Sequence, residues 1–127
     1  GNWSGAFRYP GDVFPETVFN AQIEEFNGAF IGSTQEPNMA DPQLDARVLR
    51  ADIEGVRENR TITFTKFYEE AASEGFAIRY VGEADEARMR VDGVWSNPEW
   101  SGPFFMVRED GGEAVQVEEA AEIEVGR

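Results

Sequence analysis

The sequence predicts an all-β protein: an eight-stranded antiparallel up-and-down β-barrel, followed by an acidic C-terminal tail or short helix. Apolar and polar residues alternate along most of the chain, which is the pattern of half-buried strands. Turn signals such as Asn27-Gly28 separate the alternating segments. Because each strand has one apolar face, these faces have to meet in one interior, and a closed barrel does so without a free edge. A two-sheet sandwich is the alternative.

The first half of the chain contains four predicted strands. They lie at residues 3–8, 19–24, 29–35 and 49–54. Pro10-Gly11 ends the first strand, and Asn27-Gly28 predicts a type I′ hairpin turn between the second and the third. Residues 36–45 carry two prolines and no clear period, so we expect a loop there.

The second half contains four more predicted strands. They lie at residues 61–68, 76–80, 89–95 and 100–108. Turns are expected at residues 57–60, 82–85 and 96–99, and residues 69–75 are typical of one helical turn that Gly75 ends.

The composition divides the chain into a barrel domain, residues 1–108, and an acidic C-terminal extension, residues 109–127. The extension has seven acidic residues and one Arg. We expect it to be a solvated tail, with a short acidic helix as the alternative. The chain begins with Gly1 and not Met, which indicates that a leader or another N-terminal segment has been removed.

The composition also excludes several classes of function. The 127 residues include no His and no Cys, so we expect no Ser-His triad, no thiolate nucleophile, no metal site and no bound cofactor. A net charge of 11 − 25 = −14 disfavours nucleic acid as a partner. The apolar runs are too short for membrane insertion. We expect a cytoplasmic protein, although a chain without cysteine also fits secretion or the periplasm.

Three sequence motifs resemble those of a known superfamily. Gly1-Asn2-Trp3 is similar to the Gly-x-Trp opening of the calycins, which include lipocalins and avidins, and Arg108 matches the Arg that packs on that Trp. Residues 28–34 resemble the third strand of avidin-like chains, and residues 91–108 resemble the closing strands of bacterial barrels of this kind. The resemblance implies a calycin-like barrel closed at one end by the Trp-Arg pair. The biotin-binding residues of avidins cannot be placed on this chain, so biotin is not implied.

The favoured function is non-enzymatic binding of a small, largely apolar molecule inside the barrel, entered from the end that residues 36–45 border. An eight-stranded barrel either fills itself with side chains or holds one small ligand. Lys66 and Tyr68 continue the inward face of their strand, and a buried ammonium needs a carboxylate neighbour or an anionic ligand unless it reaches the rim. The predicted ligand-binding residues are Lys66, Tyr68, Tyr80, Trp95 and Trp100. No catalytic residue is predicted.

Two other classes of function remain open. The first is a structural or interaction module with a filled barrel, which acts through a protein partner or as a homodimer. Phe67, Phe105 and Val107 on outward faces would form its apolar patch. The second is a cofactor-free enzyme with Lys66 or Tyr80 as acid or base, which would require a strongly shifted pKa.

Overall fold

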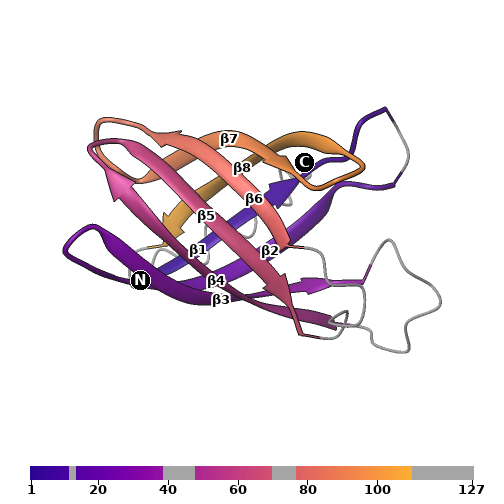
Figure 1. The fold of residues 1–127 in the computed structure, drawn as a ribbon, viewed down its shortest axis with the longest axis horizontal. Helices are drawn as coiled ribbons and strands as arrows, with labels where there is room; N and C mark the ends of the chain where they lie inside the picture. Colours follow the sequence, from indigo (N-terminus) through magenta and orange to yellow (C-terminus); the bar gives the residue numbers. More distant parts are fainter. Residues whose placement is uncertain (12–13, 39–47, 70–76, 110–127) are drawn as a thin grey trace.

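The computed structural model is a closed barrel of eight antiparallel strands in chain order (Figure 1), which confirms the predicted fold class. It describes residues 1–11, 14–38, 48–69 and 77–109. The strands are β1 (Asn2–Phe7), β2 (Thr17–Phe26), β3 (Ala29–Pro37), β4 (Val48–Glu58), β5 (Thr61–Tyr68), β6 (Ala77–Ala84), β7 (Arg90–Ser96) and β8 (Ser101–Glu109). Each strand pairs with the next, and β8 pairs with β1. Each of the eight described strands is therefore paired on both sides.

The two ends of the barrel differ in their connections. At one end, hairpins join β2 to β3 at Asn27-Gly28 and β4 to β5 at Asn59-Arg60. Asn27 has φ 56° and Gly28 has φ 86°, which agrees with the predicted type I′ turn. At the other end, longer connections join β1 to β2 and β3 to β4. We call these the short-turn end and the long-connection end.

Glycines on the inward faces let the strands bend around a narrow interior. They are Gly5, Gly32, Gly55, Gly82, Gly93 and Gly102, and a Cβ atom at any of them would lie 2.0–2.8 Å from a backbone carbonyl oxygen of a neighbouring segment. Real side chains do not fit at that distance, so each position requires glycine to keep this backbone path. Glycine kinks of this kind supply the curvature that closes a small barrel.

Aromatic rings fill most of the interior. Phe64 stacks on Tyr80 with ring centroids 4.6 Å apart, and Phe104 meets Tyr80 edge to face at 4.9 Å. The buried hydrophobic core also includes Phe7, Phe19, Ala21, Phe30, Ile53, Ile62, Ile78, Ala84, Val91, Trp95 and Met106. Half-buried Trp3 packs against this core and lies directly across from Arg108 of β8.

Several strands extend further than the sequence indicated. β3 runs to Pro37, so Glu36 belongs to a strand and not to the loop predicted at residues 36–45. β4 runs to Glu58 and β6 runs to Ala84, through positions predicted as turns. Gly82 is an inward kink of a continuous strand, and Glu58 and Glu83 are outward strand positions. The helical turn predicted at residues 69–75 and the C-terminal extension lie largely outside the described residues.

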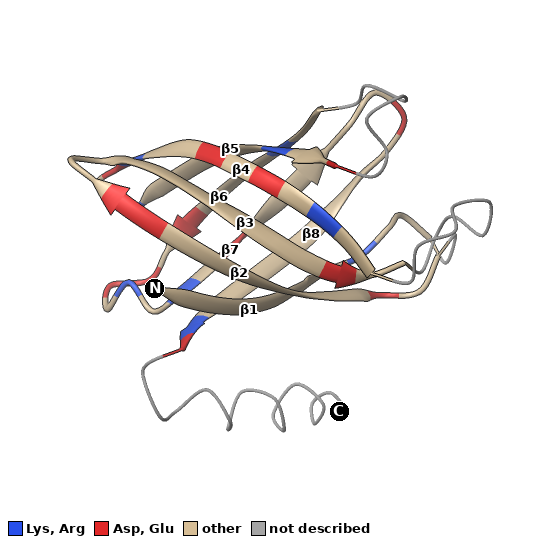
Figure 2. Cartoon of the chain, turned by 90° about the horizontal axis from the view of Figure 1, so that it is seen from below, with Lys and Arg blue, Asp and Glu red and all other residues tan. Residues whose placement is uncertain are grey.

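Charged residues lie mainly on the outer surface of the strands and near their ends (Figure 2). In the part of the chain that the structure describes, no helix is long and apolar enough to cross a membrane.

We expect Gly93→Ala to destabilise the barrel by about 1–3 kcal/mol, the usual cost of overpacking. The new Cβ would lie 2.1 Å from the Val81 carbonyl oxygen and 2.5 Å from Gly82 Cα. Urea unfolding measures the change in the free energy of unfolding. Ser101→Ala at an exposed strand position is the control, and equal urea midpoints for the two variants would contradict this account of closure.

Candidate functional site

A lysine lies inside the barrel. Lys66 follows Ile62 and Phe64 on the inward face of β5 and is 1% exposed. Its Nζ atom donates to Oε1 of Glu36 at 2.6 Å. Glu36 is 5% exposed and lies on the inward face of β3, in line with Phe30 and Thr34. The carboxylate neighbour that a buried Lys66 requires is therefore Glu36, and Lys66 does not reach the rim.

Two tyrosines extend this ion pair into a network. Tyr68 donates its hydroxyl hydrogen to Oε2 of Glu36 at 2.6 Å, and Lys66 Nζ donates to the hydroxyl oxygen of Tyr80 at 3.3 Å. Each oxygen of the Glu36 carboxylate thus has its own donor. We call Glu36, Lys66, Tyr68 and Tyr80 the polar network. A buried ion pair is tolerated when further hydrogen bonds satisfy its remaining polar atoms.

Aromatic faces surround the ammonium group on its other sides. Lys66 Nζ lies 4.8 Å from the ring centroid of Phe7 and 4.7 Å from that of Tyr68. It also lies 5.7 Å from the ring centroid of Phe19 and 5.5 Å from that of Tyr80. Cation–π attraction to these rings offsets part of the cost of removing Lys66 from water.

Three groups of the polar network, Lys66, Tyr68 and Tyr80, have raised pKa values. Burial lowers the pKa of Lys66, but the charges of Tyr80, Tyr68 and Glu36 more than offset this, and the pKa lies well above its ordinary value. At neutral pH the two phenols are uncharged, so Glu36 is the group that keeps Lys66 protonated there. Burial raises the pKa of Tyr68 and that of Tyr80.

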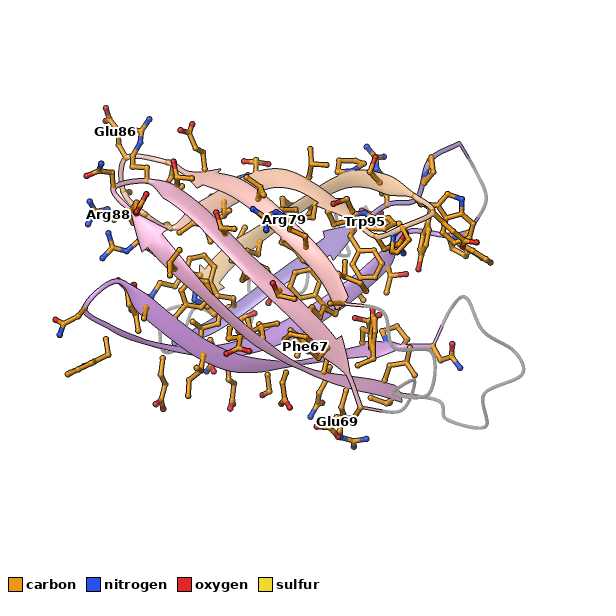
Figure 3. All side chains as sticks on the ribbon, in the orientation of Figure 1. Phe67, Glu69, Arg79, Glu86, Arg88 and Trp95 are labelled. Carbon is orange, nitrogen blue, oxygen red and sulfur yellow. The ribbon has the colours of Figure 1, made fainter. Side chains whose placement is uncertain are left out.

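A group of aromatic residues lies at the long-connection end, beside the polar network. Tyr9 meets Trp95 at 5.2 Å, Trp100 at 5.6 Å and Phe14 at 4.9 Å between ring centroids, all edge to face. We call these four residues the aromatic mouth. Trp95, labelled in Figure 3, is buried and donates its indole N–H to the carbonyl oxygen of Arg8 at 2.9 Å. Burial raises the pKa of Tyr9 to about 12.

A small cavity lies among the inward side chains of the described strands. Its volume is about 10 Å³, which is enough for about one water molecule. It is lined by Phe19, Ala21, Thr34, Ile53, Phe64, Lys66, Tyr80 and Met106. The interior is thus nearly filled in this conformation.

The predicted site residues fall into two adjacent groups. Lys66, Tyr68 and Tyr80 meet in the polar network, whereas Trp95 and Trp100 belong to the aromatic mouth. Phe7 connects the groups, since its ring lies near both Lys66 Nζ and Trp95.

Sequence reasoning missed Glu36, Tyr9 and Phe14. Glu36 has the same strand parity as Phe30, Gly32 and Thr34, and extending that alternation past Gln35 would have found it. Tyr9 and Phe14 lie beyond the strand ends, where no periodicity marks an inward side chain.

The predicted outward patch is divided. Phe67 is exposed on β5, but Phe105 and Val107 are half-buried on β8, with β6 and β7 between these strands. The guanidinium of Arg90 also covers Phe105, 4.6 Å from its ring centroid. These three residues therefore do not form one surface.

We expect Lys66→Met to destabilise the fold by about 3–5 kcal/mol, because it leaves the Glu36 carboxylate buried without its cation. The double variant Lys66→Met/Glu36→Gln should lose much less stability than the two single variants summed, with a coupling of about 2 kcal/mol or more. Urea unfolding of the four proteins measures this coupling.

The control cycle uses the more exposed ion pair Arg57–Glu25, with Arg57→Met and Glu25→Gln. Its coupling should be much smaller than that of the internal pair, because solvent screens an exposed ion pair. Equal coupling in the two cycles would show that burial does not strengthen the internal pair.

We also expect stability to fall steeply above pH 10. The folded-state pKa values of Tyr9, Tyr68, Tyr80 and Lys66 are raised. The folded state therefore holds protons that the unfolded chain releases from about pH 10 upward. The stabilisation is fully present below the unfolded-state pKa values and is lost as pH rises through the folded-state values. Tyr9→Phe should lessen the loss between pH 10 and 12, as followed by circular dichroism, and an identical alkaline profile would contradict this assignment.

The sequence matches no protein-family model and no curated protein. Solved structures similar to the chain are redesigned β-barrels. The redesigned barrel mFAP1, bound to DFHBI, is 8% identical with a TM-score of 0.65, covering 86% of this chain and 93% of that one. The redesigned barrel mFAP0, also bound to DFHBI, is 7% identical with a TM-score of 0.63. The match covers 86% of this chain and 96% of that one. A third redesigned barrel is 8% identical with a TM-score of 0.64. The match covers 87% of this chain and 90% of that one. At this identity the likeness shows a shared small eight-stranded barrel fold.

Proposed function

We propose that this chain is a non-enzymatic barrel that binds a small, largely apolar molecule at its long-connection end. The observation that carries the proposal is the aromatic mouth, where half-buried Tyr9, Phe14 and Trp100 gather around buried Trp95. Ligand sites of β-barrels lie at such mouths and combine aromatic walls with a few polar groups. The similar barrels mFAP1 and mFAP0 are bound to DFHBI, which supports the proposal through fold alone.

The polar network supplies the few polar groups that orient a ligand. Phe7 lies between the network and the mouth, 4.8 Å from Lys66 Nζ and 6.0 Å from Trp95, measured to ring centroids. A ligand that displaced the rings of the mouth would therefore come close to hydroxyl and ammonium donors.

Binding, not catalysis, is the role that suits these groups. The raised pKa values of Lys66 and Tyr80 keep both groups protonated at neutral pH. A general acid or base works best with a pKa near the working pH.

The structure also supports placing the chain among the calycins as part of this proposal. Trp3 of β1 lies directly across from Arg108 of β8, as the resemblance implies for the pair that closes one barrel end. Both residues lie at the short-turn end, opposite the aromatic mouth.

A second candidate is an interaction module whose filled barrel presents its outer face to a partner protein. Outward residues of five adjacent strands form a continuous row by direct cross-strand pairing: Val56, Thr63, Val81, Val94 and Pro103. Val56, Val81 and Val94 are 41–53% exposed. A net charge of −14 on each copy disfavours self-association through this row, so the row favours a partner other than a second copy.

A thermal-shift titration tests the proposed function with DFHBI, retinol and 2-naphthol as probes. At a hundredfold excess over Kd, binding to the folded state adds about 2.7 kcal/mol of stability, so Tm should rise by several degrees. Trp100→Leu should reduce this shift strongly, because it removes one wall of the aromatic mouth.

Trp3→Leu is the matched control, since Trp3 is also a half-buried tryptophan but lies at the short-turn end. It should leave the ligand-induced shift intact. An equal loss in both variants would contradict the proposed location. The absence of any shift with all three probes would contradict the proposed function and favour the interaction module.

A further inference from the structure

The internal cavity is lined by one residue, Thr34, whose buried hydroxyl has no partner among the described residues. Thr34 is 4% exposed, its Oγ1 atom has no hydrogen-bond partner among the described residues, and its side chain lines the cavity. A buried hydroxyl without a partner costs about 1–3 kcal/mol, so native structures usually supply one. A polar molecule in the cavity would supply it.

Two further side chains that carry hydrogen-bond donors line the same cavity. Lys66 has three N–H donors and uses one on Glu36 and one on Tyr80. Tyr80 accepts from Lys66, and its own O–H has no acceptor among the described residues. Both side chains line the cavity together with Thr34. The cavity of about 10 Å³ thus has the size for one water, and three of its lining side chains carry polar groups that small shifts could bring to a buried water.

We infer that Thr34, Lys66 and Tyr80 form a site for one uncharged oxygen, held by a water molecule in the free protein and by the hydroxyl or carbonyl oxygen of a ligand in the complex. The part that concerns the ligand rests on the proposed function. Phe19, which lines the cavity, lies 6.3 Å from Phe7, and Phe7 lies 6.0 Å from Trp95. The rings of Phe19, Phe7 and Trp95 therefore lead from the site to the aromatic mouth.

The charge of the polar network selects an uncharged oxygen over a carboxylate. Glu36 already neutralises Lys66, at 2.6 Å, in a site where both side chains are almost fully buried. A ligand carboxylate at the cavity would place a second anion beside Glu36 with no second cation to balance it. A buried charge without a partner is strongly disfavoured, whereas a hydroxyl replaces the water without adding charge.

The first test detects the water in the free protein. Long-lived internal water is measured by oxygen-17 relaxation dispersion and by water–amide NOEs near Thr34. We expect a signal in the wild type that Thr34→Val weakens or removes, because valine keeps the shape and lacks the hydroxyl. Thr63→Val on the outward face of β5 is the control and should leave the signal unchanged. A wild type without long-lived water would overturn the inference, whatever ligands bind.

The second test compares 2-naphthol with 2-naphthoate, which share a ring system and differ in the charge of their polar end. By calorimetry, the wild type should bind 2-naphthol with a Kd at least about tenfold lower, since an unpaired buried charge penalises the carboxylate. In Glu36→Gln the preference should reverse, because the ligand carboxylate then replaces the missing partner of Lys66. If Glu36→Gln is unfolded alone, added 2-naphthoate should restore its folded circular dichroism signal and 2-naphthol should not.

These outcomes distinguish a failure of the inferred oxygen site from a failure of the proposed binding function. Equal affinity for the two probes, or tighter binding of 2-naphthoate by the wild type, would overturn the inference and leave the binding function standing. A long-lived water that Thr34→Val removes, without binding of either probe, would support the oxygen site and overturn the proposed function.

Discussion

The buried ion pair between Lys66 and Glu36 organises the inside of this barrel. Removing two charges from water costs several kcal/mol per ion, so the pair requires close contact and partners for its remaining polar atoms. Tyr68 and Tyr80 provide those partners, and the rings of Phe7 and Phe19 lie around the ammonium. Because Lys66 is on β5 and Glu36 is on β3, their contact spans β4. A one-residue slip in either pairing would turn one charge outward and leave the other buried alone.

Closure of the barrel depends on inward glycines, which have no side chain, as well as on large inward rings. Inward glycines such as Gly5, Gly55 and Gly93 allow neighbouring backbones to approach where a Cβ would collide with a carbonyl oxygen. Large rings occupy the space beside them, as where Gly93 lies directly between Gly82 and Phe104 in the sheet. The alternation of glycines with aromatic residues makes the interior narrow and nearly full, and the cavity described above is no larger than about one water molecule.

Much of this architecture was predictable from local pattern. Period-2 alternation located the strands, and Asn27-Gly28 identified a hairpin whose positive φ angles require such residues. The alternation also predicts that Lys66 continues an inward face, where it either finds a partner or reaches the rim. Its partner was not found, because Glu36 precedes Pro37 and breaker residues that mark a loop in the sequence. The aromatic mouth depends on Tyr9 and Phe14, which contact Trp95 and Trp100 only after β1 and β8 come together. Local periodicity carries no information on such contacts between ends of the chain.

A nearly filled interior and a binding function are compatible if ligand entry is coupled to movement of the aromatic rings. The rings of the mouth meet edge to face at 4.9–5.6 Å, and such pairs contribute only about 0.5–1.5 kcal/mol each beyond the area they bury. A ligand ring that replaces these contacts recovers that energy. The polar network resists displacement far more strongly, since breaking it would leave a charge buried. We therefore expect the barrel to open at the aromatic mouth while the polar network stays in place beneath it. The ion pair that fixes the strand register then also determines which polar groups an entering ligand contacts.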